Sequence, residues 1–304
     1  HTHSLPDYLR SDATARFLEV THEQYERHIG AHFGNTVKGF FGDEPCLPRL
    51  PWTDGFLREF RRQKGYDLRP HLPALVGAPH PDREGIVYDY FDVLARLWTT
   101  GYYQPQTDWC ASRGMTFTAH LCGEEQMMEL IHGLNTDFFQ SLSGVGEPGV
   151  DVIWRQVYFG CTTDFPRLGG SAANVWGKPR AMTESFAVFG SGTTYEQMKY
   201  VSDYQLVRSI NDFFLMMWNY DCEGWRRLHH PPDLSTDSTL YPYLRLYSEY
   251  IGRASTVMAT GTPIADVAVY YPTRSAWLGD GASLDAAHSM GRRLLERQRD
   301  FEWI

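Results

Sequence analysis

The sequence has no long run of Lys or Arg, and its 28 basic residues are outnumbered by 37 Asp and Glu, which gives a formal net charge of -9. Binding to a nucleic-acid backbone requires clustered cations, so the sequence argues against nucleic acid as a partner. The chain also lacks a P-loop, a GxGxxG turn after a strand and the GxSxG elbow of serine hydrolases. No motif therefore supports nucleotide-dependent chemistry or a serine nucleophile.

Long hydrophobic runs are missing as well. No stretch approaches the 18 apolar residues of a membrane span, and residues 1–9 have neither the basic end nor the apolar run of a signal peptide. We therefore expect a soluble chain with no membrane partner. The compartment stays open between cytoplasmic and secreted or periplasmic, because it depends on an N-terminal segment that we expect to be missing.

The cysteines form no recognisable pairs. Their number is odd, their spacing is wide and no CxxC motif occurs: they are Cys46, Cys110, Cys122, Cys161 and Cys222. This pattern indicates neither a disulfide framework nor a zinc knuckle. We expect reduced thiols that are mostly buried.

Aromatic residues, in contrast, are abundant. The chain of 304 residues contains 9 Trp, 18 Tyr and 17 Phe, together 14% of the sequence, which exceeds what packing alone usually requires. Such an excess suits a site that stacks on sugar rings. The length suits one large α/β barrel, or a barrel together with part of another domain.

Short apolar segments alternate with amphipathic ones along most of the chain. An apolar segment bounded by Gly, Pro or polar residues predicts a buried strand, and apolar residues at helical spacing predict a helix. The predicted strands cover residues 37–42, 115–121, 149–153, 178–186 and 213–220. The predicted helices cover residues 12–32, 52–64, 84–112, 126–142, 155–175, 194–210 and 241–260. This order predicts an α/β fold with parallel strands.

Five such β–α units are too few to close a barrel of eight strands. We therefore predict that residues 1–261 form strands four to eight of a TIM-type (β/α)8 barrel whose first strands are missing. Residues 262–304 contain a predicted strand at 265–272, a helix at 284–298 and another strand from Phe301. They predict the start of a second, doubly wound α/β domain, so further domains of the same polypeptide are expected.

Two glutamates, Glu44 and Glu184, stand at the ends of predicted strands, where barrel enzymes carry their catalytic groups. As the ends of strands four and seven, they are expected to face each other across the barrel mouth. Hydrolysis of a glycosidic bond needs one carboxyl group that protonates the leaving oxygen and another that acts as base or nucleophile. We predict a glycosidase with Glu44 as general acid and Glu184 as base or nucleophile. The alternative is that both acids cap the helices that follow them.

Three more polar residues, Asp43, His120 and Glu124, follow the same strands. His120 and Glu124 are candidates for holding substrate hydroxyls or tuning the pKa of a carboxyl group, while Asp43 is a candidate for steadying Glu44, binding a sugar hydroxyl or holding a metal ion. Asp151 ranks lower, because the valines on both sides of it indicate a buried strand.

Trp218 and Tyr220 lie at the end of the last predicted strand. They are candidates for a platform on which a sugar ring stacks, and carbohydrate is the expected partner. For Trp218 the alternative, an aromatic residue in an apolar run that belongs to the core, is favoured somewhat.

Two other classes of function stay open. An H-x-H pair at His1 and His3 is the arrangement by which metal-dependent amidohydrolases hold their ions, although no apolar strand precedes it here. A barrel that binds carbohydrate without cleaving it would use the same aromatic and acidic residues.

Several segments, taken in order, resemble bacterial α-L-rhamnosidase-type enzymes of glycoside hydrolase family 106. They are GFFGDEP at 39–45, KGYDL at 64–68, HL at 120–121, KPRAMTESF at 178–186 and ADVAV at 265–269. The resemblance implies a TIM-barrel catalytic domain followed by a domain of flavodoxin-like character, within a larger multidomain enzyme.

The resemblance also implies an inverting enzyme that acts on terminal rhamnose in plant polysaccharides with the help of Ca²⁺. Oxygen ligands such as Asp43, Glu124 or Glu184 would hold the ion. Carboxylates on strands four and seven also describe retaining β-galactosidases, so this alternative stays open. A separation of about 5–5.5 Å between the carboxyl groups indicates retention, and roughly 6.5–9.5 Å indicates inversion.

Overall fold

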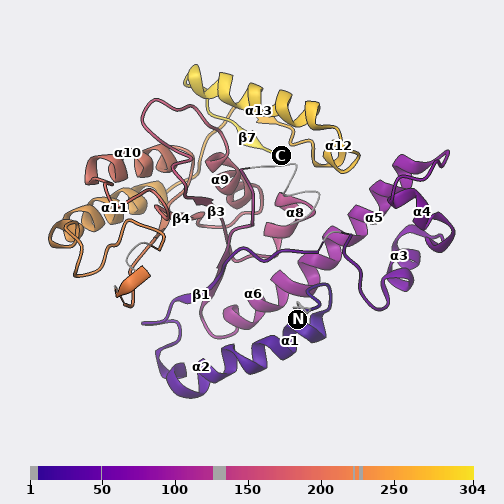
Figure 1. Ribbon diagram of the computed structural model, residues 1–304, viewed down its shortest axis with the longest axis horizontal. Coiled ribbons are helices and arrows are strands. Elements are labelled where there is room, and N and C mark those ends of the chain that lie inside the picture. Colours follow the sequence, from indigo (N-terminus) through magenta and orange to yellow (C-terminus); the bar gives the residue numbers. More distant parts are fainter. Residues whose placement is uncertain (1–5, 49, 126–134, 222, 226–228) are drawn as a thin grey trace. The chain divides into compact units, whose positions relative to one another are not determined.

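The computed structural model describes residues 6–48, 50–125, 135–221, 223–225 and 229–304 (Figure 1). The chain divides into two compact units. Unit 1 comprises His1–Gly146 and Pro272–Ala286, and unit 2 comprises Glu147–Tyr271 and Ala287–Ile304.

Both units are mixtures of helices and parallel strands. The elements of unit 1 are α1 Ser11–Val20, α2 His22–Ile29, η1 Gly30–His32, β1 Gly39–Gly42, α3 Phe56–Lys64, η2 Arg69–His71, α4 Leu72–Leu75, α5 Arg83–Trp98, η3 Thr99–Tyr103, α6 Gln104–Ala111, β2 Thr116–Ala119, α8 Phe138–Ser143 and α12 Thr273–Trp277. The elements of unit 2 are β3 Glu147–Val152, α9 Pro166–Val175, β4 Met182–Ser185, α10 Tyr195–Leu206, β5 Asp212–Leu215, η6 Tyr241–Tyr243, α11 Leu244–Met258, β6 Ala268–Val269 and β7 Glu302–Trp303. Helix α13, Gly281–Glu296, contains residues of both units.

In unit 1, β1 and β2 pair in parallel, with Gly39 opposite Thr116 and Gly42 opposite Ala119. The two glycines of β1 make this pairing possible. A Cβ atom on Gly39 would lie 2.1 Å from the carbonyl oxygen of Thr116, and one on Gly42 would lie 2.9 Å from the ring of Phe117. The predicted strands at 37–42 and 115–121 are therefore confirmed, with somewhat shorter bounds.

The long helix predicted at 84–112 is present as three consecutive segments, α5, η3 and α6. The middle segment, Thr99–Tyr103, has π-helical turns, and α6 begins with Pro105 in its first turn. Proline has no N–H group to donate into the preceding turn, so the regular α-helical bond is lost at this point. The π-type turns directly before the proline are the local adjustment to that loss.

In unit 2, the three strands β3, β4 and β5 pair in parallel in chain order. Helix α9 packs on one face of β3, since a Cβ atom on Gly169 would lie 3.2 Å from Cγ1 of Val150. Helix α10 covers the same face of β4, where Nε2 of Gln205 donates to Oγ of Ser185 at 3.0 Å. Helix α11 lies beside α10 (Figure 1).

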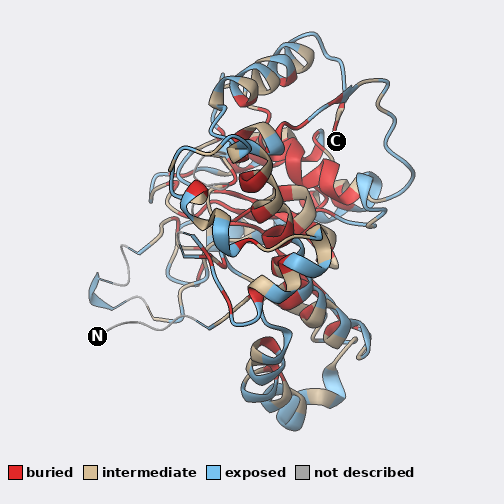
Figure 2. Cartoon of the chain, turned by 90° about the vertical axis from the view of Figure 1, so that its right-hand side faces the viewer, coloured by how far each residue is buried: buried red, intermediate tan, exposed pale blue. Residues whose placement is uncertain are grey.

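The strands and α9 form the core of unit 2. All residues of β3 and β4 are buried, as are the eight residues from Pro166 to Ala173 in α9 (Figure 2). The helix predicted at 155–175 is only partly correct, because α9 begins at Pro166. Trp154 and Arg155 have φ values of 52° and 57°, which no right-handed helix accommodates. Residues 155–165 therefore lead from β3 to α9 as a loop.

Near the end of the chain, β6 pairs with β7 in parallel, with Ala268 opposite Glu302. This confirms the parallel arrangement predicted for the strands after residue 262. The boundary near 262, the flavodoxin-like character of the second domain and the complete eight-stranded barrel stay predictions. Among the described helices, none combines the length and the apolar character needed to cross a membrane.

Candidate active site

The end of β1 carries two acidic residues in unit 1. Strand β1 stops at Gly42, and Asp43 and Glu44 follow directly, both exposed. The backbone of Glu44 has a φ of 41°, which is rare for a residue with a side chain. The residue before a proline strongly prefers an extended conformation, and Pro45 follows Glu44. A backbone held in such a disfavoured conformation is typical of a functional position.

His120 lies directly after β2 and is completely buried. Its Nε2 atom lies 3.6 Å from Oδ1 of Asp43, and its Nδ1 atom lies 3.6 Å from Oε1 of Glu124. Glu124 is also completely buried, whereas the side chain of Asp43 is 70% exposed. The imidazole therefore lies between two carboxylates that unit 1 brings together from the ends of β1 and β2.

In unit 2, Asp151 on β3 lies opposite Glu184 on β4 in the strand register. Neighbouring strands are about 4.8 Å apart, and alternate residues point to opposite faces. Val150 and Ser185 face α9 and α10, so Asp151 and Glu184 point to the face turned away from those helices. The two carboxylates are 5% and 8% exposed and are therefore neighbours in a sheltered environment.

The chain turns sharply after both strands that carry these carboxylates. Trp154 follows β3 with a φ of 52°, while Phe186 and Val188 follow β4 with φ values of 85° and 60°. For a bulky or β-branched residue a positive φ is a real outlier. Such backbone strain clusters at functional sites, so the loops after the carboxyl ends of β3 and β4 are candidates for binding substrate.

A second pair of carboxyl groups lies at the opposite ends of the strands of unit 2. Glu147 is the first residue of β3, and Asp212 is the first residue of β5. Burial raises the pKa of Glu147 to about 8, and the charge of Asp212 adds to this effect. In barrels the amino ends of the strands serve stability rather than catalysis, so we interpret this pair as structural.

This interpretation predicts a pH-dependent stability. The folded-state pKa of Glu147 lies above its ordinary value of 4.5, so its stabilising effect is complete below pH 4.5 and is lost as the pH rises through 8. We expect the free energy of unfolding to fall by about 1–3 kcal/mol from this group between pH 5 and pH 8. Urea unfolding at both pH values should show the decrease in the unmodified chain.

Glu147→Gln should remove most of this decrease, because the amide stays neutral at both pH values. The matched control is Glu249→Gln on α11, a change at an exposed residue that should leave the decrease intact. An identical decrease in both variants would mean that other groups cause it.

A model of the α-L-rhamnosidase family, glycoside hydrolase family 106, matches residues 5–279. The match covers most of the chain and includes all strands from β1 to β5. The chain belongs to glycoside hydrolase family 106.

Similar proteins have larger chains than this family 106 member. A protein of Formosa agariphila named “Putative beta-glucuronidase” is 23% identical over 253 residues, which are 80% of this chain and 20% of that protein. A rhamnosidase structure from Novosphingobium sp. PP1Y matches with a TM-score of 0.73 and 21% identity over 87% of this chain and 26% of the other. A cold-adapted β-galactosidase from Rahnella sp. R3 matches with a TM-score of 0.64 and 12% identity over 98% of this chain and 48% of the other. This chain thus spans about a fifth of the curated relative, and at these identities the two structures show a shared fold.

For the family 106 chain, the structure groups the predicted polar residues within each unit. Asp43, His120 and Glu124 come together in unit 1, and Glu184 has Asp151 as its neighbour in unit 2. Glu44 is adjacent to Asp43 in the chain. The roles assigned to these residues stay predictions.

The two predicted aromatic residues are not at the end of a strand. Strand β5 stops at Leu215, so the strand predicted at 213–220 is too long. Trp218 and Tyr220 lie in the following loop and are 56% and 105% exposed, which excludes a core position for Trp218. The ring of Trp218 contacts that of Tyr241 with centroids 5.6 Å apart.

The sequence pattern undervalued Asp151. Its valine neighbours correctly indicated a buried strand, but alternate residues of a strand point to opposite faces. The period of two in β3, with Glu147, Gly149 and Asp151 on one face, was the signal that identifies Asp151 as a partner of Glu184.

The remaining predictions concern histidines and cysteines. His1 and His3 lie outside the described residues, as does Cys222. The other four cysteines are free thiols, as expected: they are Cys46, Cys110, Cys122 and Cys161. Only Cys110 is fully buried, so the expectation of mostly buried thiols is wrong for this part of the chain.

Proposed function

We propose that the protein is a glycosidase that removes a terminal sugar, most simply an α-L-rhamnosyl residue, from plant-type glycans. The observation that carries this proposal is the family match over residues 5–279. Acidic residues directly after β1 and within β4, the positions where barrel glycosidases carry their carboxyl groups, give it chemical support.

In the proposed reaction, Glu44 is the general acid that protonates the leaving glycosidic oxygen. Its exposed position after β1 suits a group that meets the leaving part of the substrate. Glu184 is the base for a water molecule, or the nucleophile at the anomeric carbon. Asp43, whose side chain is 70% exposed, would bind a sugar hydroxyl, while the completely buried His120 and Glu124 would tune the pKa of a carboxyl group from behind it.

Trp218 and Tyr220 are proposed to bind the glycan by stacking. Both rings are largely exposed, and an exposed aromatic face is available to the apolar C–H face of a sugar ring. We propose that they contact the part of the glycan that leaves.

Calcium is a proposed cofactor. Asp43 and Glu124 offer carboxylate oxygens in unit 1, and Glu184 offers them in unit 2, which is the ligand type that Ca²⁺ prefers. Within unit 1 alone, Asp43 and Glu124 supply oxygen ligands of the type that this ion requires. When bound, Ca²⁺ would hold hydroxyl groups of the sugar.

A substrate panel tests the proposed function. The full-length protein should release nitrophenol from the 4-nitrophenyl α-L-rhamnoside, at a rate at least tenfold above that on the β-D-galactoside or the β-D-glucuronide. NMR of the first product should show inversion of the anomeric centre. Addition of EDTA should slow hydrolysis, and added Ca²⁺ should restore it.

Each alternative has its own result in this panel. Cleavage of the galactoside with retention would favour the β-galactosidase-like reaction, and cleavage of the glucuronide would favour the activity named for the Formosa relative. Sugar binding in calorimetry without any hydrolysis would identify a non-catalytic barrel.

A further inference from the structure

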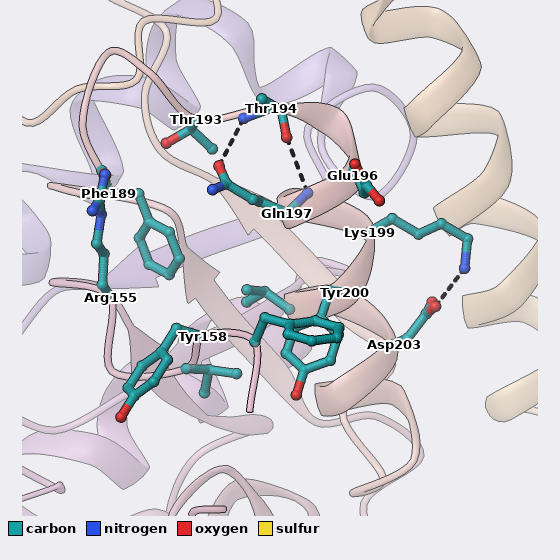
Figure 3. Close-up of a pocket in the computed structure, with 13 residues that line it drawn as sticks. Arg155, Tyr158, Phe189, Thr193, Thr194, Glu196, Gln197, Lys199, Tyr200 and Asp203 are labelled. Carbon is teal, nitrogen blue, oxygen red and sulfur yellow. Dashed lines mark hydrogen bonds and ion pairs between the residues drawn. The ribbon is translucent and has the colours of Figure 1, made fainter. Parts of the chain in front are cut away.

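Unit 2 contains a cavity that the proposed reaction does not use. It has a volume of about 740 Å³ and is lined by the loop after β3, the loop after β4 and the first turns of α10 (Figure 3). Pockets of 300–1,000 Å³ with aromatic walls and a few placed polar groups are typical of small-molecule sites. The cavity is thus large enough for a sugar ring.

Aromatic rings form much of its wall. Tyr158 and Phe159 are 59% and 85% exposed, and the centroids of Phe159 and Tyr200 are 5.1 Å apart. Figure 3 shows the rings of Tyr158 and Tyr200 on the same side of the cavity, below Phe189. A cluster of exposed aromatic rings in a cavity is typical of a ligand-binding site.

Arg155 is the basic side chain on one side of the cavity (Figure 3). Nε of Arg155 donates to the carbonyl oxygen of Phe189 at 2.5 Å, which fixes the guanidinium group. In the described part of the chain, no carboxylate forms an ion pair with Arg155. Its two terminal nitrogens can therefore bind a planar anion in the two-point fashion typical of arginine and carboxylate.

The local backbone is arranged around this side chain. Trp154 and Arg155 are both in the left-handed region, with φ values of 52° and 57°, a conformation that persists only when surrounding contacts hold it. A Cβ atom on Gly190 would lie 3.2 Å from one terminal nitrogen of Arg155. Glycine at this position leaves room for the guanidinium group.

The other charged residues of the cavity are less suited than Arg155 to binding an anion. Lys199 is paired with Asp203 at 2.5 Å and lies over the ring of Tyr250. Glu196 is on the same side of the view as Lys199, opposite Arg155 (Figure 3). An anionic ligand would therefore be directed to the Arg155 side.

We propose that this cavity is an additional carbohydrate subsite that binds a uronic acid residue of the glycan. The pyranose ring packs against Tyr158 and Tyr200, and its carboxylate binds the guanidinium group of Arg155. The inference rests on the proposed function only in that the ligand is a glycan.

Methyl α-D-galacturonoside and methyl α-D-galactoside test this inference, because they differ only in the carboxylate. Titration of the full chain, followed by saturation-transfer NMR, should show binding of the galacturonoside at least about tenfold tighter than that of the galactoside. Arg155→Gln should remove this preference, while Tyr200→Ala should weaken both sugars. Arg253→Gln, which changes an exposed arginine on α11, is the matched control and should bind like the unmodified chain.

Equal affinity for the two sugars, or a preference that survives in Arg155→Gln with an unchanged circular dichroism spectrum, would overturn the inference. The measurement needs no hydrolysis, so it is separate from the substrate panel. A chain that binds the galacturonoside through Arg155 but cleaves no glycoside would refute only the proposed function. A chain that cleaves the rhamnoside without this binding would refute only the subsite.

Discussion

Glu184→Gln is expected to lower kcat for α-L-rhamnoside hydrolysis by roughly 10²–10⁴-fold, the usual contribution of a positioned acid or base. An amide has nearly the same size as the carboxyl group, so the packing of β4 is retained. It cannot take a proton from water and cannot attack the anomeric carbon. KM should therefore change much less than kcat, which initial rates over a range of substrate concentrations will show.

Glu44→Gln should give a loss that depends on the leaving group. A general acid matters most when the leaving oxygen is strongly basic. The Glu44 variant should therefore be severely impaired with an alkyl rhamnoside and much less impaired with a dinitrophenyl rhamnoside. Glu184→Gln should be impaired with both substrates, so the two variants separate the two roles.

The control for both variants is Glu249→Gln, an exposed change on α11 that should keep full activity. Losses below tenfold in both active-site variants would contradict the assignment of Glu44 and Glu184. A thermal unfolding midpoint within a few degrees of that of the unmodified protein would show that the loss of activity does not come from unfolding.

The order of the strands could be predicted from the sequence because each strand is a short apolar segment with a clear boundary. Gly39 and Gly42 bound β1, and the acids after it mark its carboxyl end. Such local signals depend on neighbours in the chain. They explain why the sequence alone identifies Asp43, Glu44 and His120 as strand-end residues.

Features that depend on contacts between residues far apart in the chain could not be predicted from the sequence. The loop at 155–165 contains apolar and aromatic residues at spacings that imitate a helix, but two left-handed residues and the proline at 166 prevent one. Asp151 gained its importance only from the register with Glu184. The aromatic cavity was missed for the same reason, since Tyr158 and Tyr200 approach it from different elements.

Arg167 is expected to contribute strongly to the stability of unit 2. Arg167 in α9 is completely buried, and its guanidinium group donates to the carbonyl oxygen of Phe301, to Oγ of Ser209 and to Oε1 of Glu302 at 2.7–2.8 Å. These bonds connect α9 to β7, to the residue before β7 and to the loop after α10. Arg167→Met should lower the free energy of unfolding by about 3–5 kcal/mol, the usual cost of removing one partner of a buried ion pair.

The expected loss has a specific physical cause, which a double-mutant cycle isolates. In Arg167→Met, Glu302 keeps its bonds from Ser171 and Asn174 but loses its cationic partner in a largely buried position. Adding Glu302→Gln to Arg167→Met removes that charge and should recover part of the stability. Arg253→Met, at an exposed arginine, should change stability by less than about 0.5 kcal/mol. If urea unfolding gave a loss below about 1 kcal/mol for Arg167→Met, or no recovery in the double variant, then packing rather than the ion pair would hold β7 against α9.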